Sequence, residues 1–186
     1  ADVFGYVRVD ANGALLAEPM KLADAPNALT FAFLGALVGS LVRPIGGWLS
    51  DRFGGARVTQ WDTLVMIGAA LGVAFCVMKA RFSPEPGTWF VPFLLLFLLL
   101  FVTTGIGNGS TFRMIPIIFP KEQAGPVLGW TSAIAAYGAF LIPTVFSTQI
   151  KAGTPEYAMY GFVVYYVSCL LVNWWYYARR GAEIVC

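Results

Sequence analysis

Histidine is absent from this 186-residue chain, and charges of either sign are scarce, with 12 Lys and Arg against 10 Asp and Glu. The missing imidazole removes the commonest general base and metal ligand, which argues against an enzyme. The net charge of +2 is too small and dispersed to favour nucleic-acid binding. Cys76, Cys169 and Cys186 lie far apart, without metal-ligand spacing or a disulfide framework. We therefore expect no metal, no organic cofactor and no nucleic-acid partner.

Apolar side chains dominate what is present. Hydrophobic residues make up 58% of the chain and aromatic residues 16%, a composition typical of membrane proteins. About 20 apolar residues cross a bilayer core of ~30 Å. The sequence predicts an all-α membrane protein with five transmembrane helices, at 28–50, 58–78, 89–119, 124–146 and 157–177. The third run is longer than one span needs, so we expect it to tilt, to project from the bilayer or to kink near Pro116.

Residues 1–26 are of mixed polarity and are expected to form a loop outside the cytoplasm. The alternation from Val3 to Val9 is compatible with a short strand but does not require one. Asn27, which follows Pro26, is a candidate N-cap for the first helix. An odd number of spans that begins in mid-loop, without an initiator methionine, suggests a fragment of a longer protein.

Alternation across the bilayer places the turns at 51–57 and 120–123 and the C-terminus on one side. That side carries five cations: Arg52, Arg57, Lys121, Arg179 and Arg180. The short loops of the other side carry Lys79, Arg81 and Lys151, and its longer opening segment adds Arg8 and Lys21. The positive-inside rule then makes the first side cytoplasmic. We expect a multi-pass protein of the inner (plasma) membrane with a cytoplasmic tail at 181–186.

Arg43 is a cation placed at depth in an apolar helix. It lies seven residues before Ser50, about 10 Å of helix inward from the expected cytoplasmic end. An arginine at this depth is costly against lipid, so it should face the bundle interior or a watery cavity. Its planar fork of donors suits a planar oxyanion. The alternatives are a side chain that snorkels to the interface or pairs with an acid on a missing helix, since these five spans offer no obvious acidic partner.

A charged segment follows this helix. Gly47, Asp51, Arg52, Gly54 or Gly55, and Arg57 match the pattern G-x-x-x-D-R-x-G-x-x-R, which resembles the cytoplasmic-loop signature of the major facilitator superfamily. Asp51 can pair with basic groups or helix N-termini in one state and release them in another, which is the chemistry of a gate. The alternative is a solvated turn that only fixes the topology.

The third span contains the sequence GIGNGSTFR at 105–113. A phosphate-binding loop is excluded because the Lys-Ser/Thr ending is missing. Gly105, Gly107 and Gly109 are two residues apart, a spacing that turns about 200° and thins the helix on more than one face. Asn108 and Ser110 are candidates for hydrogen bonds between helices. For Arg113, snorkelling or a cytoplasmic ion pair is favoured over substrate binding.

The fourth span carries a stripe of small residues at helical spacing: Gly129, Ser132, Ala133, Ala136 and Ala139. Such a stripe lets a helix slide or rock against a partner. Ser132 is its best polar contact for a small substrate. Simple helix packing explains the stripe equally well.

Three stretches, 36–58, 103–115 and 129–143, together resemble the C-terminal half of a nitrate/nitrite porter of the major facilitator superfamily. The resemblance covers nearly all of residues 28 to 180 and implies helices eight to twelve of a twelve-helix fold. It implies that Arg43 clamps the anion together with a second arginine from the N-terminal half. It also implies that Gly129, Ser132, Ala133 and Gly138 form the eleventh-helix signature. Ala135 departs from that signature where the family often has glycine.

These observations predict transport of nitrate and/or nitrite by alternating access, with Arg43 at the anion site and Ser132 and Gly129 nearby. The partners would be the two anions, the lipid bilayer and the missing N-terminal helices. Asp62 is the one titratable carboxyl in these spans, and its position near the cytoplasmic surface leans weakly toward nitrate/nitrite exchange over proton symport. The alternatives are a carrier for another small anion, a non-transporting accessory subunit and, least favoured, a membrane enzyme.

Overall fold

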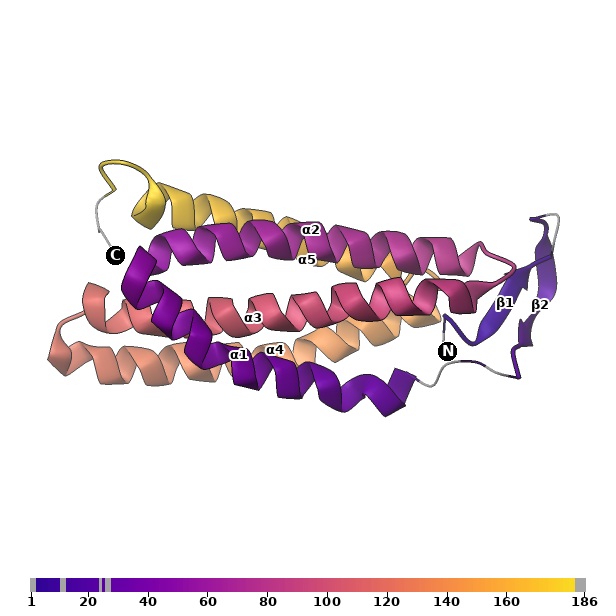
Figure 1. Ribbon diagram of the computed structural model, residues 1–186, viewed down its shortest axis with the longest axis horizontal. Coiled ribbons are helices and arrows are strands. Elements are labelled where there is room, and N and C mark those ends of the chain that lie inside the picture. The colour runs from indigo at the N-terminus through magenta and orange to yellow at the C-terminus, as the bar shows by residue number, and fades with distance from the viewer. Residues whose placement is uncertain (1–2, 11–12, 24, 26–27, 183–186) are drawn as a thin grey trace.

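The computed structural model describes residues 3–10, 13–23, 25 and 28–182, and it is dominated by five long helices that run side by side (Figure 1). A short 3-10 turn, η1 (Ala28–Phe31), precedes the first of them, and a second, η2 (Pro86–Trp89), precedes the third. The helices are α1 (Ala32–Phe53), α2 (Gly55–Arg81), α3 (Phe90–Ile118), α4 (Lys121–Lys151) and α5 (Glu156–Asn173). A π-helical turn, η3 (Trp174–Ala178), extends α5. The expected N-cap Asn27 lies outside the described residues.

All five helices are long and apolar enough to cross a membrane. This confirms the all-α membrane class. The segment at 51–57, however, is not an extended turn. Only Gly54 separates α1 from α2, and its φ of 88° lies in the left-handed region that favours glycine. Its N–H donates to Ser50 O at 2.9 Å, so the chain reverses within one residue and the charged motif lies on two helix ends.

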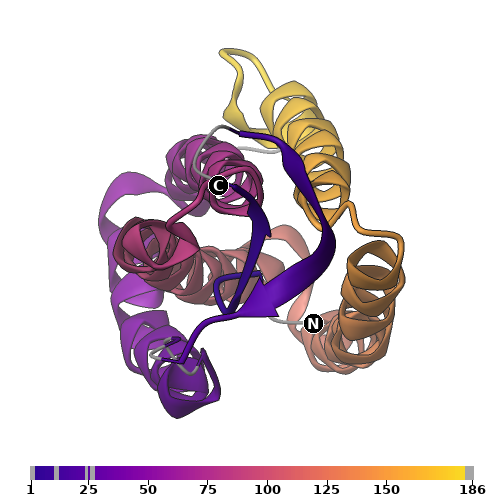
Figure 2. The same ribbon diagram turned by 90° about the vertical axis from the view of Figure 1, so that its right-hand side faces the viewer.

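The opening segment forms a β-hairpin, an outcome that the alternating residues near the start left open. Strand β1 (Tyr6–Val9) pairs antiparallel with β2 (Leu15–Lys21). Phe4, just before β1, is buried, and its ring lies 4.7 Å from Phe93 and 5.6 Å from Phe90 of α3. Figure 2 shows the hairpin lying across one end of the helices. Aromatic packing therefore holds this segment against the start of α3.

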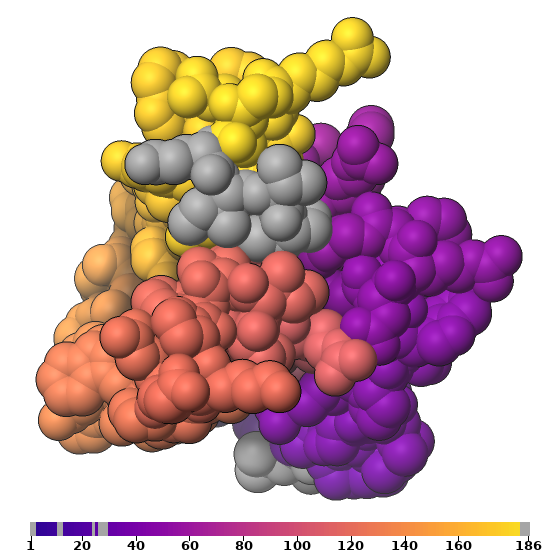
Figure 3. Space-filling view, turned by 90° about the vertical axis from the view of Figure 1, so that its left-hand side faces the viewer, coloured from indigo at the N-terminus to yellow at the C-terminus, as the bar shows by residue number. Residues whose placement is uncertain are grey.

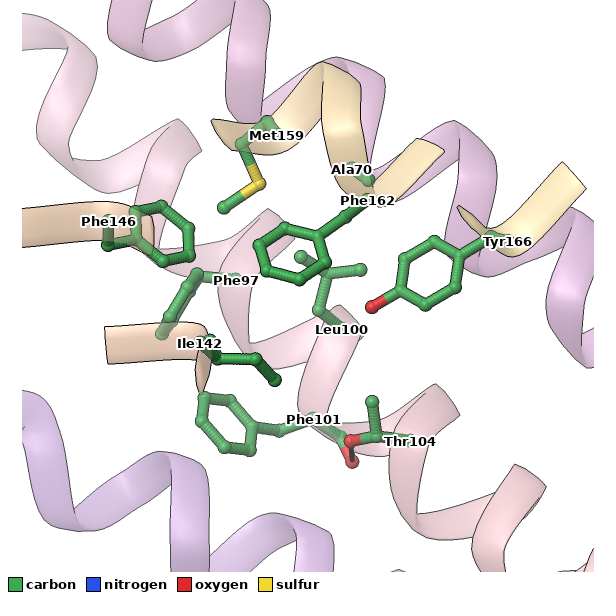
Figure 4. A pocket seen from close by; sticks show the side chains of 10 residues that line it. All are labelled: Ala70, Phe97, Leu100, Phe101, Thr104, Ile142, Phe146, Met159, Phe162 and Tyr166. Atoms are coloured by element: carbon green, nitrogen blue, oxygen red, sulfur yellow. Dashed lines mark hydrogen bonds between the residues drawn. The ribbon is translucent and has the colours of Figure 1, made fainter. Parts of the chain in front are cut away.

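Helices α2 and α3 form the centre of the molecule. The α2 residues Ala69, Ala70, Val73 and Ala74 are buried, and their small side chains let α3 and α5 pack closely. In contrast, Ala124 is the one buried residue of α4. A cavity of about 170 Å³ separates α4 from α2, α3 and α5, with aromatic and aliphatic side chains around it (Figure 4). None of the residues that line it is charged.

The two ends of the bundle differ. The α1–α2 turn, the α3–α4 turn and the end of α5 lie together at the end opposite the hairpin (Figures 1 and 3). At the hairpin end, the guanidinium of Arg81 lies 2.8 Å from the carboxylate of Glu156 and also donates to Gly153 O. This ion pair, in which Glu156 is buried and Arg81 is part-buried, ties the end of α2 to the start of α5.

Candidate functional site

The contact between α1 and α3 is made by glycines of both helices. A Cβ at Gly105 would lie 2.6 Å from Gly39 O, and one at Gly46 would collide with the backbone of Ile106. A Cβ at Gly109 would collide with Arg43 O. These distances leave no room for a side chain, so the two backbones touch directly. Arg43, which precedes Pro44 in α1, is therefore held in place by the contact of its backbone with Gly109 rather than by its side chain.

The guanidinium of Arg43 takes no part in this contact. Arg43 is exposed and makes no side-chain hydrogen bond or ion pair with any residue that the structure describes. The alternative in which Arg43 pairs with an acid on a missing helix stays a prediction. The five donors of Arg43 are available to an oxyanion or to a residue of another polypeptide segment.

Gly107 lies on a different face of α3 from Gly105 and Gly109. A Cβ there would lie 2.7 Å from Asp62 Oδ2 of α2, whereas Gly105 and Gly109 face α1. The alternating glycines thus admit two neighbours to one turn of α3. Asp62 is buried, and its Oδ2 has no hydrogen-bond partner in the described structure. The same is true of Asn108 Oδ1, so the hydrogen bond expected of Asn108 across the interface is not present there.

The signature residues at the α1–α2 turn meet α3 through charges and hydroxyl groups. Arg113 Nε lies 2.5 Å from Asp51 Oδ1, which is the ion pair considered for Arg113 from the sequence. Both side chains are about half exposed, 55% and 48% respectively, so solvent screens the pair and leaves it easy to break. The Arg52 guanidinium instead lies over the rings of Trp48 and Phe53, at 5.7 and 5.8 Å.

Beside this ion pair, Ser110 is the centre of a buried hydroxyl cluster. Its Oγ donates to Gly55 O at 2.9 Å, and it accepts from Ser50 Oγ at 2.9 Å. Because the one hydroxyl proton of Ser110 is used by Gly55 O, Thr59 Oγ1 at 2.8 Å is also a donor to it. A Cβ at Gly55 would collide with the side chain of Met114. The cluster fixes the α1–α2 turn on α3.

The small residues of α4 are not brought to this site. A Cβ at Gly129 would meet no atom within 4 Å, and one at Gly138 would approach only Ile142 of its own helix. Gly47 of α1 is as open as Gly129. Ser132 is exposed and donates to Leu128 O of its own helix at 2.8 Å, and no hydrogen bond links it to Arg43. The described residues show no contact between Ser132 and Arg43, and the prediction that both approach one anion stays a prediction.

Comparison with known proteins decides the family. No family model matches the chain. The protein named "Probable nitrate/nitrite antiporter NarK2" of Thermus thermophilus is 46% identical over 167 residues, which cover 89% of this chain and 37% of the relative. "Nitrate/nitrite transporter NarU" of Escherichia coli is 37% identical over 94% of this chain and 41% of its own length, and the "Nitrite extrusion protein" of Bacillus subtilis is 33% identical over 77% and 34%. The chain belongs to the nitrate/nitrite porter family.

The family resemblance inferred from the three motif stretches is thus confirmed, and the relatives are transporters, not enzymes. This porter chain spans about two fifths of the length of the first two curated relatives that it matches. Within its described residues, no group of His, Cys, Asp and Glu is arranged to hold a metal ion.

The sequence alone did not point to several residues at the end of the bundle that carries the charged motif of residues 51–57. Asn173 of α5 donates to Ala56 O at 2.9 Å and to Gln60 Oε1 at 2.8 Å, which ties the end of α5 to the start of α2. Ser50 and Thr59 belong to the hydroxyl cluster. These are single polar residues in apolar helices, and such residues usually find a partner on a neighbouring helix. That general expectation is the one signal that the sequence offered for them.

Proposed function

We propose that this chain is part of a carrier that moves nitrate and nitrite across the inner membrane by alternating access, with helices α1–α5 as helices eight to twelve of twelve. The observation that carries the proposal is Arg43, a guanidinium without a partner among the described residues, on a transmembrane helix of a chain whose relatives are named nitrate/nitrite transporters. A guanidinium presents parallel N–H donors in the plane of a trigonal oxyanion, which suits both anions. Ser132 and Gly129 would approach the anion only when α4 rocks toward α1.

The ion pair of Asp51 with Arg113 supports a gate at the cytoplasmic end. It joins the last turn of α1 to α3 across the mouth of the bundle, and its exposure lets water replace each partner at little cost. In our proposal the pair forms in one state of the cycle and opens in the other, while Gly47, Arg52, Gly55 and Arg57 shape the turn around it.

The remainder of the carrier would cover the open faces of the chain. Cavities of about 460 and 770 Å³ lie along α4 and α5, and α4 is almost wholly exposed. We assign the coverage of α4 and of the Arg43 side of α1 to the N-terminal helices of the same protein. Cations at the end of the bundle that carries Arg57, Lys121 and Arg180 support a cytoplasmic position for that end. Of the expected tail at 181–186, only the first two residues are described.

The anion site is tested in the full-length carrier, reconstituted in proteoliposomes preloaded with nitrite. External nitrate should drive nitrite efflux in the wild type, and Arg43→Lys should lower the efflux rate at least tenfold, because lysine keeps the charge but loses the fork. Arg180→Lys, an identical change after the last span, is the matched control and should retain the wild-type rate. Equal efflux from Arg43→Lys and Arg180→Lys would show that Arg43 is a structural cation.

The gate is tested by exchanging its charges. Asp51→Arg and Arg113→Asp should each slow exchange roughly twofold to fivefold, a modest effect because the pair is exposed. The double variant restores an ion pair of reversed polarity and should recover part of the lost rate. If the effects of the two single changes simply add in the double variant, the pair does not act as a gate.

A further inference from the structure

Asp62 is a buried carboxyl group that the proposed anion site and gate do not use. It lies near the start of α2, only 8% of its surface is exposed, and Oδ2 has no hydrogen-bond partner among the described residues. An ionised carboxylate in such a place within a membrane protein requires a counter-charge or a bound proton. The groups around Asp62 decide which of the two it has.

The surroundings of Asp62 provide no counter-charge in contact. It lines a cavity of about 500 Å³ between α1, α2 and α3. The side of α1 contributes Leu49 and Phe53, and the side of α3 contributes only apolar residues and Thr103. The Thr103 hydroxyl donates to Leu99 O and Leu100 O of its own helix and is not free to donate to Asp62.

Arg57, earlier on the same helix, is the one other charged residue that lines this cavity among the described residues, and it forms no ion pair with Asp62. A metal cation would need several oxygen ligands, which this lining does not supply. A proton needs only the carboxylate itself. The cavity extends from Asp62 to Arg57 near the α1–α2 turn.

Asp62 is also mechanically linked to the Arg43 segment. Its Oδ2 is packed against Gly107 of α3, and two residues further along the same helix Gly109 is packed against Arg43 O. One glycine-rich turn of α3 is therefore held between the Asp62 carboxyl and the Arg43 backbone. The Asp62 carboxyl and the Arg43 backbone thus contact the same turn, on different faces of α3.

We propose that Asp62 is the proton-binding residue that couples anion movement by this carrier to a proton gradient. The inference rests on the proposed transport of nitrate and adds a co-transported proton to it. The carboxylate binds a proton from one side in the anion-loaded state and releases it in the other state, so that nitrate and a proton move together without net charge. The unpartnered Asp62 carboxyl favours symport, whereas the sequence alone weakly favoured exchange.

The test uses the full-length carrier in nitrite-free proteoliposomes with an alkaline interior. For one proton per nitrate, a gradient of one pH unit should raise steady-state nitrate accumulation about tenfold in the wild type. Asp62→Asn has the same shape and cannot titrate, so its ratio of gradient-driven uptake to nitrate/nitrite exchange should fall about tenfold. Glu122→Gln, which neutralises an exposed carboxyl at the start of α4, is the matched control and should keep the wild-type ratio.

An infrared titration gives a readout that a purely structural role would not move. The wild type should show a protonated-carboxyl band that disappears as the pH is raised, is absent from Asp62→Asn and is shifted in Asp62→Glu. A band that persists at every pH would show that Asp62 stays protonated, and would reject the proposal. If Asp62→Asn does not insert, the shift between wild type and Asp62→Glu makes the assignment, and its absence rejects the proposal.

The proposal is also rejected if uptake follows a sodium gradient, if exchange and gradient-driven uptake fall equally in inserted Asp62→Asn, or if the wild type exchanges anions without responding to pH. Loss of both exchange and uptake in the wild type would instead reject the proposed function.

Discussion

Gly105 and Gly109 are residues at which α3 packs directly against the backbone of α1, and the free energy of folding is sensitive to side-chain size at such positions. A methyl group at Gly109 would collide with Arg43 O, a backbone atom that cannot turn aside. By contrast, Gly161 of α5 has nothing within 4 Å of a Cβ. Gly109 and Gly161 are both helical, so their substitution by alanine separates the effect of overpacking from that of helix propensity.

We expect Gly109→Ala to lower the free energy of unfolding in detergent by about 1–3 kcal/mol, because α1 and α3 must separate to admit the methyl group. Gly161→Ala should be neutral or stabilising by about 0.5–1 kcal/mol, as expected for alanine in an open helix interior. Thermal unfolding of the full-length carrier, monitored by intrinsic tryptophan fluorescence, measures both. Equal stability of the two variants would show that the α1–α3 contact is looser than the structure has it.

At the scale of elements, the hydroxyl cluster joins α1, α2 and α3 at the end that carries the charged motif. Ser110 is fully buried and occupies the centre of the cluster. Removing its Oγ leaves Gly55 O without that donor and Ser50 Oγ without its closest acceptor. A buried polar group that is left without a partner destabilises the folded state by its full desolvation penalty.

Ser110→Ala should therefore destabilise the carrier by about 1–3 kcal/mol. Ser168→Ala is the matched control, because Ser168 is exposed and its one side-chain hydrogen bond among the described residues is to Tyr165 O of its own helix; its effect should stay within about 0.5 kcal/mol. Hydrogen exchange of the α1–α2 turn should also increase in Ser110→Ala and remain unchanged in Ser168→Ala. Unaltered exchange at that turn in Ser110→Ala would mean that the Gly54 backbone alone holds it.

For the whole molecule, the sequence predicted what depends on composition and local pattern. Apolar length identified five spans, and the glycine spacing of α3 indicated approach on more than one face. The sequence did not reveal which neighbouring helix each glycine contacts, because the packing of Gly107 against Asp62 depends on the rotation of α2 about its axis. The one-residue turn at Gly54 was hidden because two adjacent glycines left the reversal point ambiguous. The hairpin depends on Phe4 packing against α3, a contact between segments far apart in sequence.

Integrity of the whole bundle should depend on the ion pair at the end opposite the gate. Arg81 and Glu156 join the end of α2 to the start of α5, and Glu156 is 5% exposed. Glu156→Gln removes the charge of one partner and leaves the part-buried Arg81 guanidinium with its hydrogen bond to Gly153 O but without its counter-ion, which should cost about 1–3 kcal/mol of folding free energy. Glu85→Gln is the matched control, because Glu85 is exposed at the same end and forms no ion pair with the described residues. A fall in the unfolding temperature confined to Glu156→Gln would support this role. Equal unfolding temperatures for the two variants would mean that packing of α2 on α3, rather than this ion pair, holds that end together.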